Sequence, residues 1–381
     1  MTPTQNLLYA TSFGGLIAGL SLWSLNGLLD FSVAEGTPVL NGTLAQAFET
    51  HYDEEFPAKR LGTNLWALLD YGLFGEGRQG VIIGQDGWLY SNEEFDPVAD
   101  GSRHMRDNLA LVQGVRDALA QRDIQLVLAI IPSKSRLYPE HVGEATPTAL
   151  RQDLYERFRG AVRKAGITAP DLLATLEDAK NQGQVFLRTD THWTPMGAEA
   201  VAGRLGQAVG EAMTLRGSPQ QYLTEIEGHE DYKGDLTRFL PLEPLFEDLM
   251  PAPDQLQKRT TRRQDDAVGD DALFAESDVP VALVGTSYSA NDKWNFAGAL
   301  RQALQRDLVN HAEDGHGPIL PMLRYLQSDE LKNAAPQLVI WEFPERYLPM
   351  PSDLSDFDPD WVAGLRKGSV DDTRLASRTG H

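Results

Sequence analysis

The stretch Val281-Ala282-Leu283-Val284-Gly285-Thr286-Ser287-Tyr288-Ser289 places a serine between small residues just after four apolar residues. A short apolar run that ends at a turn residue is typical of a buried strand. The stretch therefore predicts a strand that presents a serine at its end, which suits an exposed nucleophile. We prefer Ser287 to Ser289, because Ser287 is the first serine after the strand and Ser289 falls in the following turn.

A second segment, Asp190-Thr191-His192-Trp193, supplies the partners that such a serine needs. An aspartate and a histidine two residues apart point the same way on an extended chain. A serine hydroxyl needs an adjacent base near neutral pH, and an imidazole can take its proton and return it. We therefore predict an acyl-transfer site with Ser287 as nucleophile, His192 as base and Asp190 fixing the imidazole tautomer.

Each of these residues also has a non-catalytic interpretation. Ser287 would be a turn serine, His192 a capping or core histidine, and Asp190 a turn aspartate at a strand end. The developing oxyanion would be held by backbone N–H groups around Ser287 or at the start of the following helix. The sequence leaves open which of these groups donates.

Helix-like and strand-like segments alternate along the chain around these two motifs. Thr194 and Pro195 are typical of the N-cap and first position of a helix. Strands that alternate with helices indicate an α/β fold with a mostly parallel central sheet covered on both faces. We predict helices at residues 105–121, 150–165, 195–212 and 294–306, strands at residues 125–131, 185–187, 281–284 and 338–341, and a hairpin at residues 81–90.

Four of these strands run directly into loops that carry polar side chains, after residues 131, 187, 284 and 341. In open parallel sheets, ligands bind at the carboxyl ends of the strands. The four loops would therefore converge on one crevice, which favours a catalytic role for each of them over an incidental one.

The composition excludes several kinds of protein and site. The 381 residues are 41% hydrophobic and 23% charged, which is typical of a globular protein with a real core. The formal charge of −21 argues against nucleic acid as a partner, because phosphate neutralisation needs clustered cations. The chain has no cysteine, which excludes disulfides, thiolate metal sites and a cysteine nucleophile.

Other chemistries have weaker signals, and we expect no metal and no cofactor. His311 and His316 flank Asp314 in a glycine-rich loop, which makes a poor pair of metal ligands. Glu342 and Glu345 could serve as the paired carboxylates of a glycosidase, but nothing singles them out. The chain has no glycine-rich loop of the P-loop or dinucleotide-binding type.

The first 29 residues carry no charged side chain. Residues 7–29 would form a helix of about 34 Å, enough to cross a hydrocarbon core of about 30 Å. We therefore predict a signal-anchor or transmembrane segment over residues 1–30, ahead of an exported body. The alternative is a signal peptide cleaved near Ser32-Val33-Ala34.

The remainder divides into one large domain, residues 31–350, and a tail, residues 351–381. Residues 228–279 hold several prolines and a charged run and fit the alternating pattern poorly, so we expect an irregular insertion there. The tail has many charges and few large apolar residues, so we expect it to be mobile.

Several segments together resemble the periplasmic alginate O-acetyltransferases of the AlgJ/AlgX type, within the SGNH-hydrolase-like superfamily. The specific pair is Asp-x-His-Trp at residues 190–193 with Gly-Thr-Ser-Tyr-Ser at residues 285–289. The supporting segments, which extend the resemblance over about residues 45–348, are His51-Tyr52-Asp53-Glu54-Glu55-Phe56-Pro57 through Trp66, Gly84-Gln85-Asp86-Gly87-Trp88-Leu89-Tyr90, Ile131-Pro132-Ser133-Lys134 with Tyr138-Pro139-Glu140, and Trp341-Glu342-Phe343-Pro344-Glu345-Arg346-Tyr347.

Two features refine the resemblance. The serine follows the aspartate and histidine, as in this acetylase family, whereas it precedes them in ordinary SGNH esterases. The AlgX branch carries a C-terminal carbohydrate-binding module, for which we find no matching segment, and the N-terminus here is of the membrane type. The membrane-anchored AlgJ branch is therefore the closer likeness.

The resemblance implies a three-layer SGNH-hydrolase-like sandwich that O-acetylates mannuronate residues of exported alginate, with Asp190, His192 and Ser287 as the triad and an acetyl-serine intermediate. It also implies a periplasmic location, an anchor in the inner membrane, a membrane O-acyltransferase as acetyl donor partner, and an alginate export and acetylation complex. The alternative location is soluble periplasmic, after cleavage.

An alginate acceptor is a polyanion, so a chain of charge −21 needs a local cationic path to bind it. We expect the substrate-binding residues in or near the four loops. The cations are Lys134, Arg136, Arg188, Lys293 and Arg346, the stacking aromatics are Trp193 and Trp294, and Tyr288 and Tyr347 lie beside them.

Two rival functions use the same features. An exported carbohydrate acetyl-esterase would have the same triad, with water instead of a sugar hydroxyl capturing the acyl-serine. A non-catalytic component of a polysaccharide export complex would keep only the fold.

Overall fold

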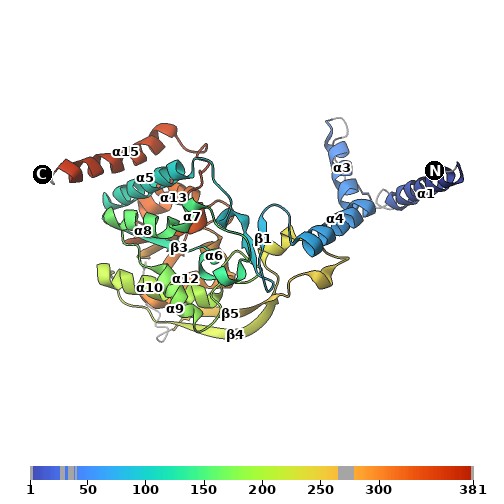
Figure 1. Cartoon of the computed structure of the whole chain (residues 1–381). Coiled ribbons are helices and arrows are strands. Elements are labelled where there is room, and N and C mark those ends of the chain that lie inside the picture. Colours follow the sequence, from blue (N-terminus) through green and yellow to red (C-terminus); the bar gives the residue numbers. More distant parts are fainter. Residues whose placement is uncertain (1–2, 26–30, 33–37, 39–40, 265–278, 379–381) are drawn as a thin grey trace. The chain divides into compact units, whose positions relative to one another are not determined.

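The computed structural model describes residues 3–25, 31–32, 38, 41–264 and 279–378. The chain forms two compact units. The N-terminal unit comprises Met1–Arg78 and Arg238–Met250, and the sheet unit comprises Gln79–Thr237 and Pro251–His381. The backbone therefore passes between the units after residues 78, 237 and 250. Figure 1 shows the elements of both units.

The N-terminal unit is helical in the part that the structure describes. Its helices are α1 (Pro3–Ser24), α3 (Thr43–Glu55) and α4 (Pro57–Leu69), and α4 continues into a π-helical turn, η1 (Asp70–Phe74). The buried Asn64 side chain ties α4 to the returning segment by donating to the carbonyls of Pro241 and Glu243, at 2.5 and 2.8 Å. Helix α1 is long and apolar enough to cross a membrane, by length and composition, with a mean hydropathy of 1.3.

The sheet unit is built on a four-stranded parallel sheet in the order β3-β8-β6-β7. The strands are β3 (Gln125–Ile131), β8 (Leu338–Pro344), β6 (Val281–Val284) and β7 (Leu308–Asn310). Strand β8 lies at the centre, where Ile340 is paired with Val127 on one side and Leu283 on the other. The parallel sheet of the predicted α/β fold is therefore present.

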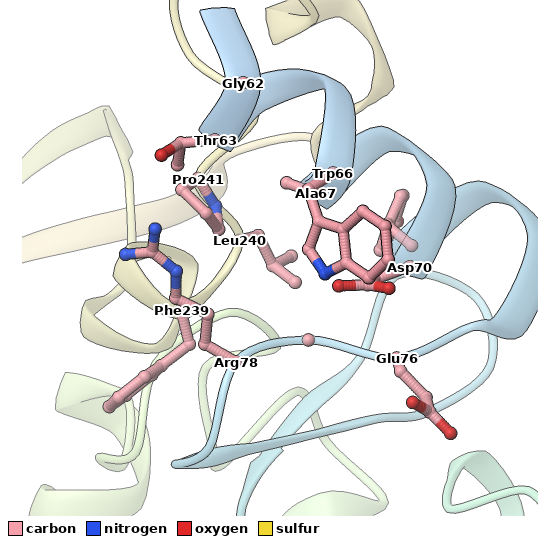
Figure 2. Close-up of a pocket in the computed structure, with 12 residues that line it drawn as sticks. Gly62, Thr63, Trp66, Ala67, Asp70, Glu76, Arg78, Phe239, Leu240 and Pro241 are labelled. Carbon is pink, nitrogen blue, oxygen red and sulfur yellow. The ribbon is translucent and has the colours of Figure 1, made fainter. Parts of the chain in front are cut away.

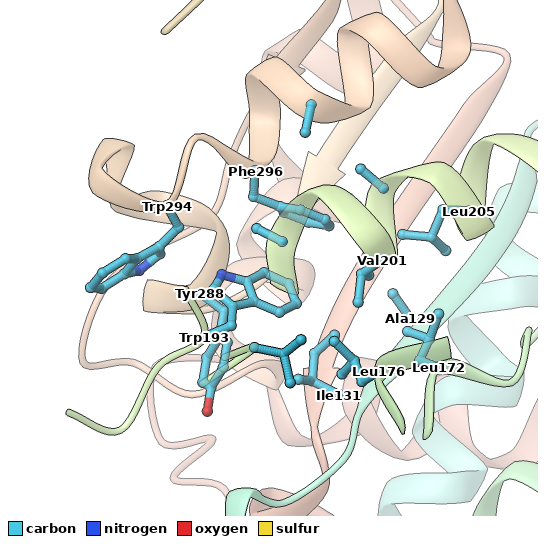
Figure 3. Close-up of a cluster of buried hydrophobic side chains, with 14 of the residues drawn as sticks. Ala129, Ile131, Leu172, Leu176, Trp193, Val201, Leu205, Tyr288, Trp294 and Phe296 are labelled. Carbon is cyan, nitrogen blue, oxygen red and sulfur yellow. The ribbon is translucent and has the colours of Figure 1, made fainter. Parts of the chain in front are cut away.

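Alternate residues of these strands point to opposite faces and enter two separate hydrophobic cores. Ile340 joins the core covered by α9 (Leu172–Lys180), α10 (Pro195–Ala212) and α12 (Phe296–Leu304). Trp341 joins the core covered by α5 (Gly101–Ala120), α8 (Leu154–Lys164) and α13 (Ile319–Gln327). Helices on both faces give the expected three-layer sandwich (Figure 1), and Figure 3 shows part of the first core.

The segment expected to be an irregular insertion contains a long antiparallel ribbon, which corrects that expectation for the residues described. Strands β4 (Tyr222–Tyr232) and β5 (Asp254–Arg263) pair with one bulge near Gly228. One face of the ribbon packs on α12 largely through polar side chains such as Thr224 and Thr261, and the other face is exposed. Its strands therefore lack the apolar alternation that signals a strand. Residues 265–278 of the expected insertion lie outside the described residues.

The segment expected to be a mobile tail contains helix α15 (Pro359–Arg378), which packs on the sheet unit. Phe357 and Val362 are buried in the second core. The backbone of α15 approaches α5 so closely that a Cβ at Gly114 would lie 2.1 Å from the carbonyl oxygen of Leu365. The expectation of a mobile tail is therefore wrong for these packed residues, whose apolar side chains are few but lie on one side of a helix.

The remaining elements are short, and several refine the predicted boundaries. Residues 185–187 form no strand of the sheet, because only Phe186 pairs, with Trp193. The helix predicted at residues 150–165 is interrupted at Asp153. The other elements are β1 (Val81–Ile83), β2 (Leu89–Ser91), α6 (Lys134–Leu137), α7 (Ala149–Gln152), α11 (Ser287–Ala290), α14 (Asp329–Asn333), and the 3-10 turns η2 (Asn92–Glu94), η3 (Pro139–His141), η4 (Asp235–Phe239), η5 (Glu247–Leu249), η7 (Asp292–Trp294) and η8 (Glu345–Tyr347).

Candidate active site

Ser287 lies just beyond the carboxyl end of β6 and is the first residue of the short helix α11. The turn before it is held against β8 by the buried carboxylate of Glu342. That carboxylate accepts the Thr286 backbone N–H at 2.7 Å and the Ser289 hydroxyl at 3.1 Å. A Cβ at Gly285 would lie 2.5 Å from a Glu342 carboxylate oxygen, so only glycine fits this close approach.

The structure brings the three predicted triad residues together. Ser287 Oγ lies 2.7 Å from His192 Nε2, and His192 Nδ1 lies 2.6 Å from Asp190 Oδ1. All three side chains are buried, and Ser287 is the most accessible at 9% exposure. With Nδ1 donating to the carboxylate, Nε2 is free to accept the serine proton, which is the arrangement a base needs. The rival Ser289 instead donates its hydroxyl to Glu342.

Asp190 is held by donors on both of its carboxylate oxygens. Oδ1 accepts the backbone N–H of His192 at 2.8 Å as well as the ring nitrogen. Oδ2 accepts the Tyr232 hydroxyl and the Asp235 backbone N–H, each at 2.9 Å. Burial by itself would raise the pKa of Asp190, but the hydrogen bonds and the positive charge of His192 outweigh it and lower the pKa below its ordinary value.

Two aromatic side chains fix the imidazole ring of His192. The Trp294 ring stacks on it with centroids 5.1 Å apart, and Tyr288 lies on another side at 4.7 Å. Trp294 Nε1 also donates to the Ser287 carbonyl at 3.2 Å, and the Tyr288 hydroxyl donates to the Thr191 carbonyl at 2.7 Å. The rotamer of the base is therefore set by packing and hydrogen bonds together.

One backbone donor of the turn is left over for a ligand. In α11, the Tyr288 N–H bonds the Thr286 side chain and the Ser289 N–H bonds the Thr286 carbonyl. Among the described residues, the Ser287 N–H has no acceptor. It lies on the nucleophile itself, where an oxyanion donor is required.

Lys134 does not line an open surface, which corrects the expectation that it contacts substrate. It is 1% exposed, and its ammonium donates to the carbonyls of Leu89, Arg188 and Asp190 at 2.5, 2.8 and 2.9 Å. Burial lowers the pKa of Lys134 to about 8, against the raising effect of nearby carboxylates. Through these three hydrogen bonds, Lys134 holds the backbone of the Asp190 segment against β2.

The expected stacking aromatics are also buried. Trp193 packs against Tyr288 and Phe296 in the first core, with centroids 5.1 and 4.7 Å apart (Figure 3). Trp294 is buried against His192 and the Ser287 carbonyl. Trp193 and Trp294 thus have no free face for a sugar ring, which corrects the expectation of direct stacking. Tyr288, expected to bind substrate, is buried with them.

The expected cations differ in what they contact. The guanidinium of Arg188 donates to the Ala252 carbonyl at 2.8 Å, which ties the triad segment to the start of β5. Arg136 pairs with Glu345. Arg346 is buried, with Nη1 3.2 Å from the Tyr288 hydroxyl and its guanidinium over the ring of the half-buried Tyr347.

Lys293 is the one cation of the expected set that the structure places on an exposed part of the triad surroundings. It is exposed, and its ammonium lies 4.7 Å from the centroid of the Tyr232 ring, whose hydroxyl binds Asp190. A polyanion that reached Ser287 could meet this charge.

Three residues of the ribbon region hold the triad and were missed from the sequence. Tyr232 and Asp235 bind Asp190, and Asp235 also accepts the Thr191 N–H at 2.8 Å. Asp254 accepts the Thr189 N–H and hydroxyl at 2.9 and 2.6 Å. No local pattern in the sequence marks these three residues as partners of the triad segment.

Among the described residues, the ligand atoms of Asp190, His192 and Asp235 lie within 4.8 Å of one another, as in a metal site. However, His192 Nδ1 is bonded to Asp190, and the Asp235 carboxylate is occupied by Thr191. We therefore assign these groups to the hydrogen-bond network of the triad.

Residues 81–345 match the family described as SGNH hydrolase-like domain, acetyltransferase AlgX. The chain belongs to this acetyltransferase family. The expected family and fold are thereby confirmed. The matched residues include the triad segments and both strands of the ribbon.

Similar chains of this acetyltransferase family cover the whole length. The probable alginate O-acetylase AlgJ of Azotobacter vinelandii is 60% identical over 381 residues, which are 100% of this chain and 98% of the relative. The protein of the same name from Pseudomonas aeruginosa is 55% identical over 97% of this chain and 96% of its own length.

Two solved structures show the same fold. The O-acetyltransferase domain of Pseudomonas putida AlgJ is 57% identical, with a TM-score of 0.71, and the match covers 76% of this chain and 100% of that domain. Pseudomonas aeruginosa AlgX, at 24% identity and a TM-score of 0.53 over 71% of this chain and 66% of its own, is similar in fold alone.

Proposed function

We propose that this chain transfers acetyl groups to hydroxyls of alginate, on mannuronate residues, through an acetyl-serine on Ser287. The observation that carries the proposal is the contact of 2.7 Å between Ser287 Oγ and His192 Nε2, with Asp190 behind the ring. The names of the relatives, alginate O-acetylases, support the acceptor.

In the first half-reaction, His192 Nε2 takes the proton of Ser287 as Oγ attacks the carbonyl carbon of an acetyl ester donor. The tetrahedral intermediate collapses when the ester bond breaks, and the leaving oxygen takes the proton from His192. The product is acetyl-serine with a neutral imidazole. Asp190 stays ionised and stabilises the transient imidazolium, consistent with its lowered pKa.

In the second half-reaction, an alginate hydroxyl takes the place of the departed alcohol. His192 accepts its proton as the oxygen attacks the acetyl-serine carbonyl, and Ser287 then leaves and recovers that proton. The Ser287 backbone N–H, which has no acceptor among the described residues, is the donor we propose for the oxyanion in both halves. Such a donor contributes roughly 10²- to 10³-fold in rate.

The relatives of this chain support transfer over hydrolysis. They are named alginate O-acetylases, and the matching family is described as an acetyltransferase. An esterase with the same triad is the second candidate. Such an esterase would hydrolyse the donor ester at a rate that does not depend on the presence of the polymer.

We also propose the surroundings in which this chain works. Helix α1 would anchor it to the inner membrane with the sheet unit in the periplasm, where no cytoplasmic acetyl-CoA is present. A membrane O-acyltransferase would then supply acetyl groups within an alginate export and acetylation complex. The similarity to AlgX, named an alginate biosynthesis protein, supports this context.

The decisive test is the intact mass of the protein after exposure to an activated acetyl ester. We expect one added acetyl group on the wild-type chain, mapped to Ser287, and none on Ser287→Ala. Ser289→Ala is the matched control, because it lies two residues away and binds Glu342, not His192. An adduct that persists in Ser287→Ala would refute the acetyl-serine.

A second measurement separates the rivals. Adding polymannuronate should accelerate deacetylation of the acyl-enzyme and place the acetyl group on the polymer. Deacetylation that is unchanged by polymer would favour the esterase, and a Ser287→Ala chain that still supports full polymer acetylation in cells would favour the non-catalytic component.

A further inference from the structure

The large apolar side chains that are exposed are concentrated in the N-terminal unit. Among the described residues of the sheet unit, only three are exposed: Leu223, Ile226 and Val309. The N-terminal unit exposes them along α1 and again along α4 and η1. An exposed apolar cluster of this kind marks a surface that meets another apolar medium.

On α4 and η1 these side chains form one stripe, which comprises Leu65, Trp66, Leu69 and Leu73. Their exposures are 45, 67, 43 and 73%. Residues four apart lie on the same side of a helix, and Trp66 adjoins the line formed by the three leucines. None of the four is charged, and the half-buried Asp70, four residues after Trp66, borders the stripe.

The other side of α4 is already occupied. Asn64 and Ala67 are buried there, and Asn64 bonds the carbonyls of Pro241 and Glu243. Figure 2 shows Trp66 and Ala67 beside Leu240 and Pro241, around a cavity of about 300 Å³ within this unit. The three leucines of the stripe therefore lie on the outward side of a helix whose inward side is fixed, and Trp66 lies between that side and the cavity.

Helix α1 indicates that the apolar medium nearest to the stripe is a lipid bilayer. Helix α1 is a candidate membrane span whose side chains are almost all exposed, and it ends at Ser24, before α4 begins at Pro57 in the same unit. Because both helices belong to one compact unit, α4 stays near the surface of any bilayer that α1 enters. Leucine and tryptophan on one side of a helix are typical of helices that lie in the plane of a lipid interface.

We propose that the stripe of α4 and η1 lies in the headgroup and acyl boundary of the phospholipid bilayer that α1 enters. The contact is apolar: the stripe has no cation, and a chain of charge −21 has no overall attraction to anionic lipid. The insertion is therefore insensitive to salt. This goes beyond acetyl transfer, and it does not depend on the chemistry of Ser287.

The test uses the full chain, which has no cysteine and so accepts a single label cleanly. Single variants Leu69→Cys and Leu73→Cys are labelled with an environment-sensitive fluorophore and reconstituted in phosphatidylcholine vesicles. Quenchers attached to lipid acyl chains and aqueous iodide then report which medium surrounds the label. Because both leucines are exposed, cysteine should not disturb folding.

Two controls come from the same chain. Leu16→Cys, in the middle of α1, reports whether the anchor has inserted. Leu223→Cys is an exposed leucine of similar accessibility on the ribbon of the sheet unit and reports a label in water.

We expect the labels at 69 and 73 to respond to the lipid quencher and resist iodide, at a depth of about 5–10 Å, with no change at high salt. The label at 223 should show the reverse. If 69 and 73 behave like 223 while 16 is inserted, the proposal is refuted and the anchor stands. If 16 also remains in water, both the anchor and the proposal fail.

A third result would also overturn the lipid contact. Labels at 69 and 73 that neither quencher reaches would mean that protein covers the stripe. In vesicles that contain only this chain, the cover would be a second copy. Dilution to one chain per vesicle would then restore iodide quenching.

Discussion

The sheet unit and the N-terminal unit treat large apolar side chains in opposite ways. In the sheet unit, Trp193, Trp294 and Trp341 are almost fully buried, and two of them pack beside the triad. In the N-terminal unit, Trp66 is two-thirds exposed. The difference teaches that the sheet unit is stabilised by its own cores and positions its catalytic groups through them, whereas the N-terminal unit presents apolar surface to something outside itself.

The largest effect should come from Asp190→Asn, which alters the triad and leaves the N-terminal unit untouched. The amide cannot stabilise the imidazolium and favours the wrong tautomer, so we expect acetyl transfer to fall by about 10⁴-fold. Steady-state transfer to polymannuronate measures this, and circular dichroism should show an unchanged fold. A loss of less than tenfold would remove Asp190 from the mechanism.

The next effect contrasts two tryptophans directly. Trp341→Ala empties a buried site between β8 and its covering helices, and we expect the sheet unit to lose about 3–5 kcal/mol of unfolding free energy. Trp66→Ala removes a mostly exposed ring and should cost about 0.5 kcal/mol or less. Urea titrations of both variants measure the two losses of unfolding free energy. Equal losses would contradict the contrast between a buried and an exposed tryptophan.

A third test concerns the buried carboxyl of Glu342 in the sheet unit. The described part of the N-terminal unit has no buried carboxylate to compare with it. Burial raises its pKa from an ordinary 4.5 to about 7 in the folded chain. The folded state therefore binds the proton more tightly, so this stabilisation is present below pH about 4.5 and is lost as pH rises through about 7.

As pH rises from about 4.5 to about 7, the proton that Glu342 keeps only in the folded state should make the free energy of unfolding of the wild type fall by an amount on the order of 3 kcal/mol. This fall should be absent from Glu342→Gln. Denaturation of wild type and variant across this range measures it. Parallel stability curves for the two proteins would show that Glu342 does not titrate there.

The smallest effect should come from Tyr232→Phe on the ribbon. It removes one donor from Asp190 Oδ2 but leaves the Asp235 N–H in place, so we expect about a tenfold fall in kcat. KM should be unchanged.

Tyr222→Phe is the matched control for that variant. Tyr222 begins the same strand, but its hydroxyl bonds Gln220 and lies away from Asp190. If both variants lowered activity equally, the ribbon would act through its general stability and not through the Tyr232 hydroxyl.

The sequence predicted the parts of the molecule that have strong local signals. Strands β3 and β6 and helix α10 begin and end where the apolar runs and the Thr194-Pro195 cap indicate. The juxtaposition of Ser287, His192 and Asp190 was also predicted, from their residue types and spacing. Only three of the four expected loops follow strands of the sheet, because residues 185–187 make a single bridge with Trp193 instead.

What the sequence did not predict depends on contacts between distant segments. The ribbon packs largely through polar side chains and has no apolar alternation, so neither its strands nor the roles of Tyr232, Asp235 and Asp254 could be recognised. Lys134, Trp193 and Trp294 were expected at a surface because loops usually are exposed. Their burial depends on which side of the turn each side chain takes, and that is set by tertiary packing.

The three passages of the backbone between the units include one beside the triad. Two of them, after residues 237 and 250, bracket the connection of the ribbon, and the first lies only two residues beyond Asp235, which donates to the triad aspartate. The residue that caps the catalytic aspartate therefore sits next to a point where the chain leaves the sheet unit, so a change in residues 238–250 acts on the chain directly beside the triad.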